Sequence, residues 1–370
     1  MTDDARSGYG LSEQKGQGTF PAPLLSYLPP TPSYKPKIGL IGCGGITEYH
    51  LRAYKNAGLD IVALCDIDLE RCKARQAEFY PDAQIGIDPQ SIFDNPDIAV
   101  VDIATHPDVR VELVKRALDA GKHVLSQKPF AKDLDTAREL IAYAAERKLQ
   151  LAVNQNGRWA PHFSYMRQAI TAGHIGEVCS VDFTLHWDHN WTAETPFDAI
   201  YHLILYDFAI HWFDMACVFF GGQQAERVFA SIAKTPSQQG TPPYMAHVVA
   251  DFPTGQATFV FNADCPFGQE DRSVVTGTKG VLRSVGPGIT EQTVTLHTED
   301  GTATPELTGD WFTNGFEGCM TELLCAIEED RAPMNSAASV LPGLALCFGA
   351  CESADSGAVV ELAGRTDKTP

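Results

Sequence analysis

A short apolar run that ends in closely spaced glycines, at residues 37–47, constrains this chain more than any other feature. The run predicts a buried strand, Gly42 and Gly44 predict a tight turn, and the pattern of residues 48–57 predicts a helix. Glycines at such a turn let backbone N–H groups approach a pyrophosphate at the helix N-terminus, where the helix dipole favours an anion. The residues expected to meet a dinucleotide here are Gly42, Gly44, Gly45 and Ile46.

An acidic residue follows the next apolar run at the distance that a dinucleotide-binding unit requires. Residues 61–65 are apolar, and Asp66 comes nineteen positions after Thr47. A carboxylate there accepts the ribose hydroxyls of NAD and repels the 2′-phosphate of NADP, a repulsion to which Asp68 adds and which Arg71 could offset. Thr47 occupies the place of the third glycine, so the fingerprint is incomplete. An ordinary strand–turn–helix unit without a ligand is the alternative interpretation.

Length, charge and cysteine usage restrict the class of protein. A chain of 370 residues, 44% hydrophobic and 20% charged, indicates a globular protein of two domains. The net charge of −19 argues against a nucleic-acid partner. We see no apolar run near the ~18 residues that span a membrane and no secretion signal. The ten cysteines form no Cys-x-x-Cys pair, so we expect reduced thiols in a cytoplasmic protein.

Composition and pattern divide the chain into three segments. Residues 1–36 are rich in glycine, serine and proline, residues 37–157 form the predicted dinucleotide-binding domain, and residues 158–370 form a second domain for substrate binding and oligomerisation. The first segment is either a flexible tail or an arm that docks on its own or a neighbouring subunit. The side chains that would dock are Leu24, Leu25, Tyr27 and Leu28.

Strands and helices alternate through the first domain. Strands are predicted at 98–105, 123–126 and 149–154, and helices at 109–120 and 134–147. This alternation predicts an α/β Rossmann fold, a doubly wound parallel sheet whose ligands bind at the carboxyl ends of the strands. The residues expected along this rim are Thr105, His106, Gln127, Lys128, Asn154 and Gln155, and we expect all but Gln155 to help bind NAD.

The pattern changes after Gly176. A partly alternating stretch at 178–187 predicts a strand, and two hairpins are predicted around 253–255 and 277–280. Two helices are expected at 316–329 and 337–354, with Ser336 as the N-cap of the second. The second domain is therefore expected to be α+β, with an open and mainly antiparallel sheet.

Three residues are candidates for chemistry. Lys128 follows a predicted strand at the binding rim, although most lysines are merely solvated. Asp207 and His211 are four residues apart, a spacing that places both on one face if the segment is helical. A carboxylate so placed can orient an imidazole that acts as a general base, but such a pair can equally be structural.

With these motifs in place, the chain resembles the family of glucose–fructose oxidoreductase and inositol dehydrogenase (Gfo/Idh/MocA) over residues 37–362. The family's glycine turn, Glu-Lys-Pro tripeptide and Asp-x-Gly-x-His segment appear here as Gly42-Cys43-Gly44-Gly45, Gln127-Lys128-Pro129 and Asp207-Phe208-Ala209-Ile210-His211. The resemblance implies that Lys128, Asp207 and His211 are catalytic. It also implies a second domain that oligomerises, and we expect a homodimer or homotetramer. The sequence departs from the family at Gln127, at Ala209 and at 202–205, where a glycine run is common.

An aromatic and polar stretch at 186–191 suits sugar recognition, because rings stack on sugars and polar groups bind hydroxyls. We expect the substrate to meet Lys128, Arg158, Trp159, His186, Asp188, Asp207 and His211. His186 and Asp188, with His189, His202 or Asp214, could instead bind a metal. No spacing here is a recognised metal signature, so we predict none. A strand-end cluster of ordinary polar residues is the third interpretation.

Together these observations predict an NAD-dependent dehydrogenase that oxidises a hydroxyl of a sugar, sugar derivative or cyclic polyol. An aldose oxidised at its anomeric carbon is one candidate substrate. Two alternatives stay open: a glycoside hydrolase that uses NAD for transient sugar oxidation, and a non-enzymatic sensor of NAD or sugar.

Overall fold

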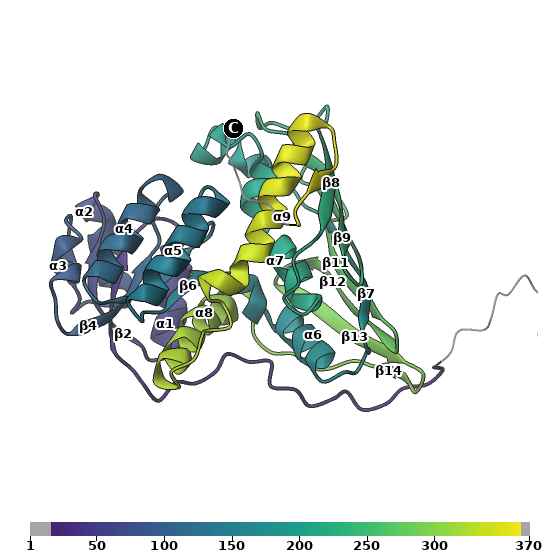
Figure 1. Cartoon of the computed structure of the whole chain (residues 1–370), viewed down its shortest axis with the longest axis horizontal. Helices are drawn as coiled ribbons and strands as arrows, with labels where there is room; N and C mark the ends of the chain where they lie inside the picture. Colours follow the sequence, from purple (N-terminus) through teal and green to yellow (C-terminus); the bar gives the residue numbers. More distant parts are fainter. Residues whose placement is uncertain (1–15, 364–370) are drawn as a thin grey trace, which may run out of the picture.

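The computed structural model describes residues 16–363, which form two sheets with helices between them. Figure 1 shows the smaller sheet and its helices on the left and the larger sheet edge-on at the right, with α7 (Ile210–Phe219) and α9 (Ala337–Ser356) between them. The predicted combination of a parallel α/β domain and an α+β domain is confirmed.

The first sheet is a Rossmann sheet of six parallel strands in the order β3-β2-β1-β4-β5-β6. Its strands are β1 (Lys37–Ile41), β2 (Asp60–Cys65), β3 (Gln84–Gly86), β4 (Ile98–Ile103), β5 (His123–Gln127) and β6 (Leu151–Asn154). Its helices are α1 (Thr47–Asn56), α2 (Leu69–Phe79), α3 (Gln90–Phe93), α4 (Pro107–Asp119) and α5 (Leu134–Glu146). The strand order reverses between β1 and β4, which is where such sheets bind ligands.

The second sheet has nine strands in the order β14-β13-β12-β11-β7-β10-β9-β8-β15. The pair β7 and β10 is parallel, and every other neighbouring pair is antiparallel. Its strands are β7 (Val178–His186), β8 (Arg227–Ala233), β9 (Met245–Phe252), β10 (Gly255–Asn262), β11 (Glu270–Gly277), β12 (Gly280–Gly288), β13 (Glu291–Thr298), β14 (Gly301–Ala303) and β15 (Val360–Glu361). Both predicted hairpins are present, as β9–β10 and β11–β12.

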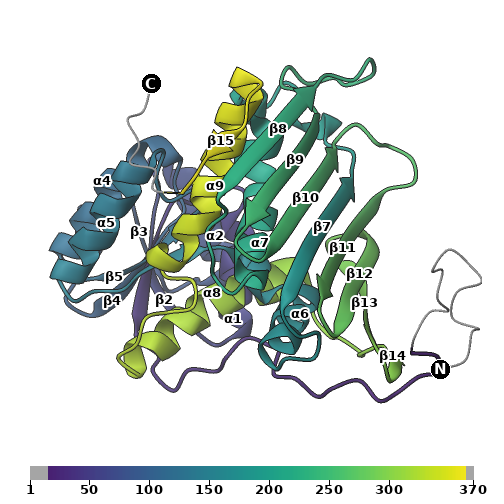
Figure 2. The same ribbon diagram turned by 45° about the vertical axis from the view of Figure 1, so that its right-hand side comes forward.

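The two faces of this sheet differ in their cover. Helices α6 (Pro161–Thr171), α7 and α9 lie over one face, and Figure 2 shows the other face without helices. Large apolar side chains on the uncovered face are partly exposed, among them Phe229, Val249 and Val285. An open, partly apolar sheet face of this kind is a candidate surface for contact with another protein.

The C-terminal helices join the two parts. Helix α8 (Trp311–Glu328) packs on α1 and β6 of the Rossmann part, and α9 packs on α7, β8 and α5. The predicted N-cap is confirmed, since the Ser336 hydroxyl accepts a hydrogen bond from the backbone N–H of Ser339. Helix α9 is long and apolar enough to cross a membrane, but 56% of its apolar window is buried inside the protein, as in a core helix.

The described part of the N-terminal segment, residues 16–36, runs as an arm over its own chain (Figure 1). The Phe20 N–H donates to the carbonyl of Thr302 at 3.1 Å, and the Tyr165 hydroxyl donates to the carbonyl of Pro23. Farther along, the N–H of Tyr34 donates to Glu328 of α8 at 3.2 Å. The arm therefore contacts both β14 and α8, whereas Leu24 is fully exposed. Residues 1–15 lie outside the described residues.

Candidate active site

The glycine turn between β1 and α1 has the shape that a bound diphosphate needs. Gly42 has φ +100°, and a Cβ there would lie 2.7 Å from the Ala104 carbonyl oxygen, so only glycine fits. No other atom lies within 4 Å of where a Cβ of Gly44 or Gly45 would be. The turn thus leaves open space at the N-terminus of α1, and Ile46 caps that helix with no side-chain hydrogen bond.

Asp66 ties the end of β2 to this turn. Its carboxylate accepts hydrogen bonds from the N–H of Cys43 at 2.7 Å and from the N–H of Asp68 at 2.9 Å. Because an ionised carboxylate has about four lone-pair sites, it retains capacity for ribose hydroxyls. Thr47, in place of the third glycine, is fully buried and donates its hydroxyl to the Gly44 carbonyl at 2.7 Å, which braces the turn.

The rim at the carboxyl ends of the strands carries polar atoms that lack partners. Thr105 Oγ1, Gln127 Oε1 and Asn154 Oδ1 are buried with no hydrogen-bond partner within the protein. Gln155, on the same rim, is also buried, and neither polar atom of its side-chain amide has a partner. Buried polar atoms normally have partners, so these atoms indicate a ligand with polar groups. Together with the open glycine turn, they fit a dinucleotide.

His106, predicted to join this rim, is placed differently. Its side chain is 73% exposed and lies 3.1 Å from Asp108 in the first turn of α4.

A buried arginine that the sequence analysis missed holds this rim together. Arg110, in α4, donates to the carbonyls of Thr105 and Pro129 and so links the segments that follow β4 and β5. Burial lowers its pKa to about 10, so it still carries its charge at neutral pH. Nothing in the pattern of α4 distinguishes this arginine from a surface residue.

A second set of residues that was not predicted from the sequence forms a buried hydrogen-bonded group next to the rim. His50 of α1 contacts Asp102 of β4 at 2.7 Å, and the hydroxyl of Tyr54 donates to the same carboxylate oxygen at 2.7 Å. His50 also lies 3.3 Å from the side-chain amide of Asn154. All four side chains are fully buried, so the position of Asn154 is fixed by contacts inside the Rossmann part.

The structure brings the three candidate catalytic residues together. Lys128 Nζ donates to the backbone carbonyl of Asp207 at 2.6 Å and to its carboxylate at 3.1 Å. The pKa of His211 lies well below its ordinary value, first because the imidazole is buried and second because the charge of Lys128 is close. His211 is therefore a neutral base at pH 7, and its Nδ1 is buried with no protein partner.

The expected contact between Asp207 and His211 is not formed among the described residues; the Asp207 carboxylate is paired with Lys128. The segment Leu203–Phe208 is a π-helix, and α7 begins only at Ile210. A π-helix has a wider turn than an α-helix, so the four-residue spacing no longer stacks the two side chains.

These residues line one cavity of about 570 Å³ between the two parts of the chain. This volume is within the range of ligand sites, ~300–1,000 Å³. The Rossmann part contributes Ile46, Tyr49, Gln127 and Lys128. The remaining lining residues are Asn156, Trp187, Asp188, His189, Trp191, Phe197, Asp207, Phe208, His211, Trp212, Gln269, Gly288, Ile289, Thr290, Trp311, Phe312 and Phe316.

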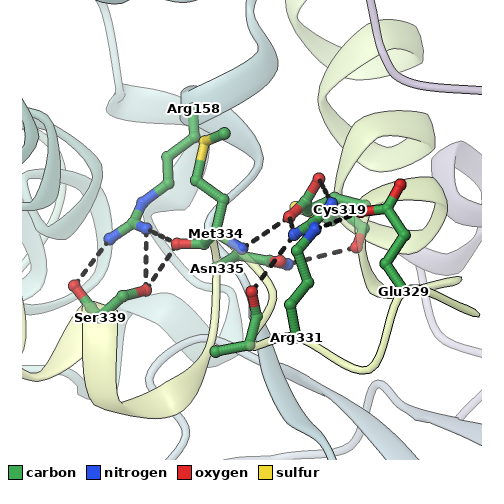
Figure 3. Close-up of polar contacts among 9 residues, drawn as sticks. Arg158, Cys319, Glu329, Arg331, Met334, Asn335 and Ser339 are labelled. Carbon is green, nitrogen blue, oxygen red and sulfur yellow. Dashed lines mark hydrogen bonds and ion pairs between the residues drawn. The ribbon is translucent and has the colours of Figure 1, made fainter. Parts of the chain in front are cut away.

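Of the other residues predicted to bind substrate, Asp188 lines the cavity and three do not. Arg158 is buried and bonds to Asp214 through two N–H groups at 2.7 Å each. Figure 3 shows it also bonded to Ser339 and Met334. The prediction failed because residues 156–159 form a short 3₁₀ turn, η2, that points Arg158 into the protein.

The two remaining residues lie in the sheet and the core. Trp159 is 2% exposed and packs tightly against Gly318 of α8. A Cβ added to that glycine would lie 2.1 Å from the indole ring. His186 pairs with Asn262 and Glu270 as the last residue of β7, away from the cavity lining.

Two of the side chains considered as metal ligands are engaged elsewhere. His202 contacts Asp355 at 3.0 Å, and Asp214 binds Arg158. Within residues 16–363, no group of three His, Cys, Asp or Glu side chains is placed to hold a metal ion.

Comparison with known proteins agrees with this architecture. Residues 36–155 match the NAD-binding Rossmann-fold domain of the oxidoreductase family GFO_IDH_MocA, and residues 163–283 match the C-terminal domain of that family. D-apiose dehydrogenase of Paraburkholderia graminis is 28% identical over 90% of this chain and 92% of its own length. Inositol 2-dehydrogenase of Rhizobium meliloti is 28% identical over 86% and 96%.

Solved structures share the fold. An oxidoreductase from Agrobacterium radiobacter, solved with NAD+, L-tartaric acid and magnesium, has a TM-score of 0.79 at 23% identity and covers 89% of this chain and 99% of its own. A putative myo-inositol dehydrogenase from Sinorhizobium meliloti has a TM-score of 0.75 at 26% identity and covers 89% and 100%. Both domains match one family in order, so the chain belongs to the GFO/IDH/MocA family of NAD-binding oxidoreductases.

Proposed function

We propose that this protein is an NAD-dependent dehydrogenase that oxidises a hydroxyl group of a sugar, sugar derivative or cyclic polyol. The observation that carries the proposal is the single cavity in which Lys128 and His211 meet beside the nucleotide-binding edge of the Rossmann sheet. Relatives of this chain named D-apiose dehydrogenase and inositol 2-dehydrogenase support the substrate class.

In this proposal His211 is the general base. Its lowered pKa keeps the imidazole unprotonated at neutral pH, so it can accept the proton of the substrate hydroxyl. Bound NAD supplies the acceptor for the hydride that leaves the same carbon, which becomes a carbonyl. The proton on His211 then passes to solvent.

Lys128 has a different task. Its ammonium group stabilises the alkoxide charge that develops as the proton leaves, and its position in a partly closed cavity strengthens this effect. Asp207 holds the ammonium group through its carboxylate and its carbonyl. We therefore assign Asp207 to the positioning of Lys128 rather than of the imidazole.

Cofactor preference follows from Asp66. Its carboxylate, fixed by two backbone N–H groups, suits a ribose diol and repels a 2′-phosphate. Asp68 follows two residues later. Arg71 lies 3.4 Å from Asp68, whose carboxylate partly offsets the charge of the arginine. We propose that the enzyme uses NAD in preference to NADP.

We further propose that the protein assembles as a homodimer or homotetramer through the uncovered face of the nine-stranded sheet. Partly exposed apolar residues on that face would be buried in such a contact. Light scattering coupled to gel filtration would show a multiple of the chain mass of 40.2 kDa, whereas a monomer would contradict the assembly.

The function is tested by screening sugars, cyclic polyols and sugar acids for NADH absorbance, with NAD and NADP in parallel. Net NADH formation with a sugar, polyol or sugar acid would support the proposal. Glycoside cleavage without NADH accumulation would indicate a hydrolase instead. Binding of NAD with no turnover of any compound in the screen would contradict the dehydrogenase and favour a sensor.

A further inference from the structure

Five ring-bearing side chains form a continuous cluster in the wall of the cavity. They are Trp187, His189, Trp191, Phe197 and Phe208, here called the aromatic cluster. They come from three successive segments: the turn after β7, the 3₁₀ turn η4 (Pro196–Ala199) and the π-helix. Because Phe208 directly follows Asp207 in the chain, the cluster borders the group of Lys128, Asp207 and His211.

The rings are arranged around Trp191. Its indole packs edge-on against Phe197, with centroids 5.5 Å apart at 79°, and against Phe208, at 6.3 Å and 87°. His189 stacks on Trp187 at 5.1 Å and packs edge-on against Phe208 at 4.3 Å. Trp191 is nevertheless 57% exposed, so a large part of this apolar side chain in the cavity wall has no protein cover.

The charge of the lining restricts what can cover it. Lys128 is the only lysine or arginine among the lining residues of this described cavity, and it is paired with Asp207. Asp188 adds a second carboxylate, although one of its oxygens already accepts from Asn190. Burial lowers the pKa of His189 to about 4, so its ring is neutral. An anionic group placed against the aromatic cluster would therefore have no cationic partner other than Lys128.

Hydrogen-bonding capacity is also unevenly distributed. Next to Lys128 the cavity offers Gln127, Asn156, Asp207 and His211, which suits the hydroxyls of a sugar ring. The aromatic cluster offers mainly ring faces and edges, because its partnerless ring nitrogens, Trp187 Nε1 and His189 Nδ1, are buried. Sugar hydroxyls placed against the exposed surface of Trp191 would lose water without gaining partners. A planar apolar group has no such cost and gains from stacking on Trp191.

We propose that the aromatic cluster is an aglycone subsite, which binds a planar apolar group attached to the sugar that Lys128 and His211 oxidise. The substrate class would then be neutral aryl glycosides or similar sugar conjugates rather than free sugars. This inference rests on the proposed dehydrogenase function, because it assumes that a sugar occupies the neighbouring polar half of the cavity.

The first test compares methyl, cyclohexyl and phenyl glycosides of the sugar that is turned over best, with kcat/KM measured by NADH absorbance. The phenyl glycoside should exceed the methyl glycoside by roughly tenfold, as expected for about 1.4 kcal/mol of stacking and burial. Cyclohexyl should fall between them, since it is apolar but not planar. Equal kcat/KM values for all three would overturn the inference.

A substitution at Trp191 tests whether the aromatic cluster causes the preference for the phenyl glycoside. In Trp191→Ala the ratio of phenyl to methyl kcat/KM should fall close to one. The control is Phe267→Ala, which removes a ring of 86% exposure from the loop between β10 and β11, outside the cavity lining, and should keep the wild-type ratio. If Trp191→Ala also kept that ratio, the aromatic cluster would not be the subsite.

A binding measurement separates failure of this inference from failure of the proposed function. Calorimetric titration of phenol into the NAD-loaded protein should show binding to the wild type and a loss of roughly tenfold or more in affinity in Trp191→Ala. Phenol binding without any sugar oxidation would refute the dehydrogenase but keep the subsite. Turnover of free sugars with no phenol binding would refute the subsite but keep the dehydrogenase.

Discussion

The two halves of the site are built in different ways. The Rossmann half, along the carboxyl ends of the parallel strands, is mostly backbone and small or polar residues, with open space beside Gly44 and Gly45 and buried oxygens without partners on Thr105, Gln127 and Asn154. The half from the second domain is side chains, mostly large rings, taken from loops, a π-helix and the start of α8. The first half fits one cofactor closely, while the second can change its ligand through single substitutions.

This difference explains why the cofactor is easier to identify than the substrate. A dinucleotide is bound by backbone geometry that needs glycine at fixed positions, so the requirement is visible in the sequence. A substrate is bound by side chains whose only common property is that the fold brings them together. If the two halves are independent, a substitution in one half should leave the ligand affinity of the other unchanged.

The largest expected effect is on kcat, from the two catalytic residues, which come from different halves of the site. Lys128→Ala and His211→Ala should each lower kcat by about a thousandfold or more, because a general base and an electrostatic stabiliser each contribute about 10²–10⁴. NAD affinity, measured by calorimetry, should stay within a few-fold of the wild type. Near-normal turnover in either variant would show that the residue is not catalytic.

A substitution at Asp66 should affect only the Rossmann half. Asp66→Ala removes the acceptor for the ribose hydroxyls and a negative charge, so the KM for NAD should rise roughly tenfold or more while NADP use improves. Sugar KM, determined at saturating cofactor, should be unchanged. An unaltered ratio of NAD to NADP efficiency would contradict the role given to this carboxylate.

Asp271 of β11 contributes to the stability of the second domain from outside the cavity. Its carboxyl is 1% exposed, both oxygens lack partners, and burial, followed by the nearby charge of Glu270, raises its pKa to about 8. In the unfolded chain the group ionises near pH ~3.9. The folded form therefore binds a proton that the unfolded form has lost, and this group makes the protein less stable as pH rises from about 4 to about 8.

Asp271→Asn should remove that dependence. At pH 8 the variant should be more stable than the wild type, by an amount on the order of 2 kcal/mol, and the difference should shrink toward pH 5. Thermal unfolding followed by circular dichroism at both pH values measures this. A difference that stays constant with pH would show that the carboxyl is ionised in the folded protein.

The smallest expected change concerns the pH profile. Since the pKa of His211 lies well below its ordinary value, the imidazole is already neutral at pH 6.5. The kcat/KM of the wild type should then show no loss between pH 7.5 and 6.5, and its acid limb should appear at lower pH. A half-maximal rate near pH 6.5 would indicate an imidazole exposed to solvent and far from Lys128.

The sequence predicted the fold well because its signals are local. The glycine turn, the alternation of 98–154 and the hairpins around 253–255 and 277–280 each depend on neighbouring residues, and all are present. The pairing of Asp207 with Lys128 was missed because a π-helix replaces the assumed α-helix, and no propensity marks that change.

The substrate half was predicted only in part for a related reason. The stretch 186–191 was recognised from its composition, but Phe197, Phe208, Trp311 and Phe316 reach the cavity through tertiary packing alone. The position of Arg158 and Trp159 directly after β6 predicts contact with the substrate, yet a single 3₁₀ turn places both in the interior.

Combining the two catalytic substitutions in one protein gives the most direct test of whether an imidazole and an ammonium group act together on one substrate. If Lys128 and His211 form one unit, the rate of the doubly substituted enzyme should be within about threefold of the slower single variant. If the two losses multiplied instead, the residues would contribute independently to the rate, and the joint action proposed here would be wrong.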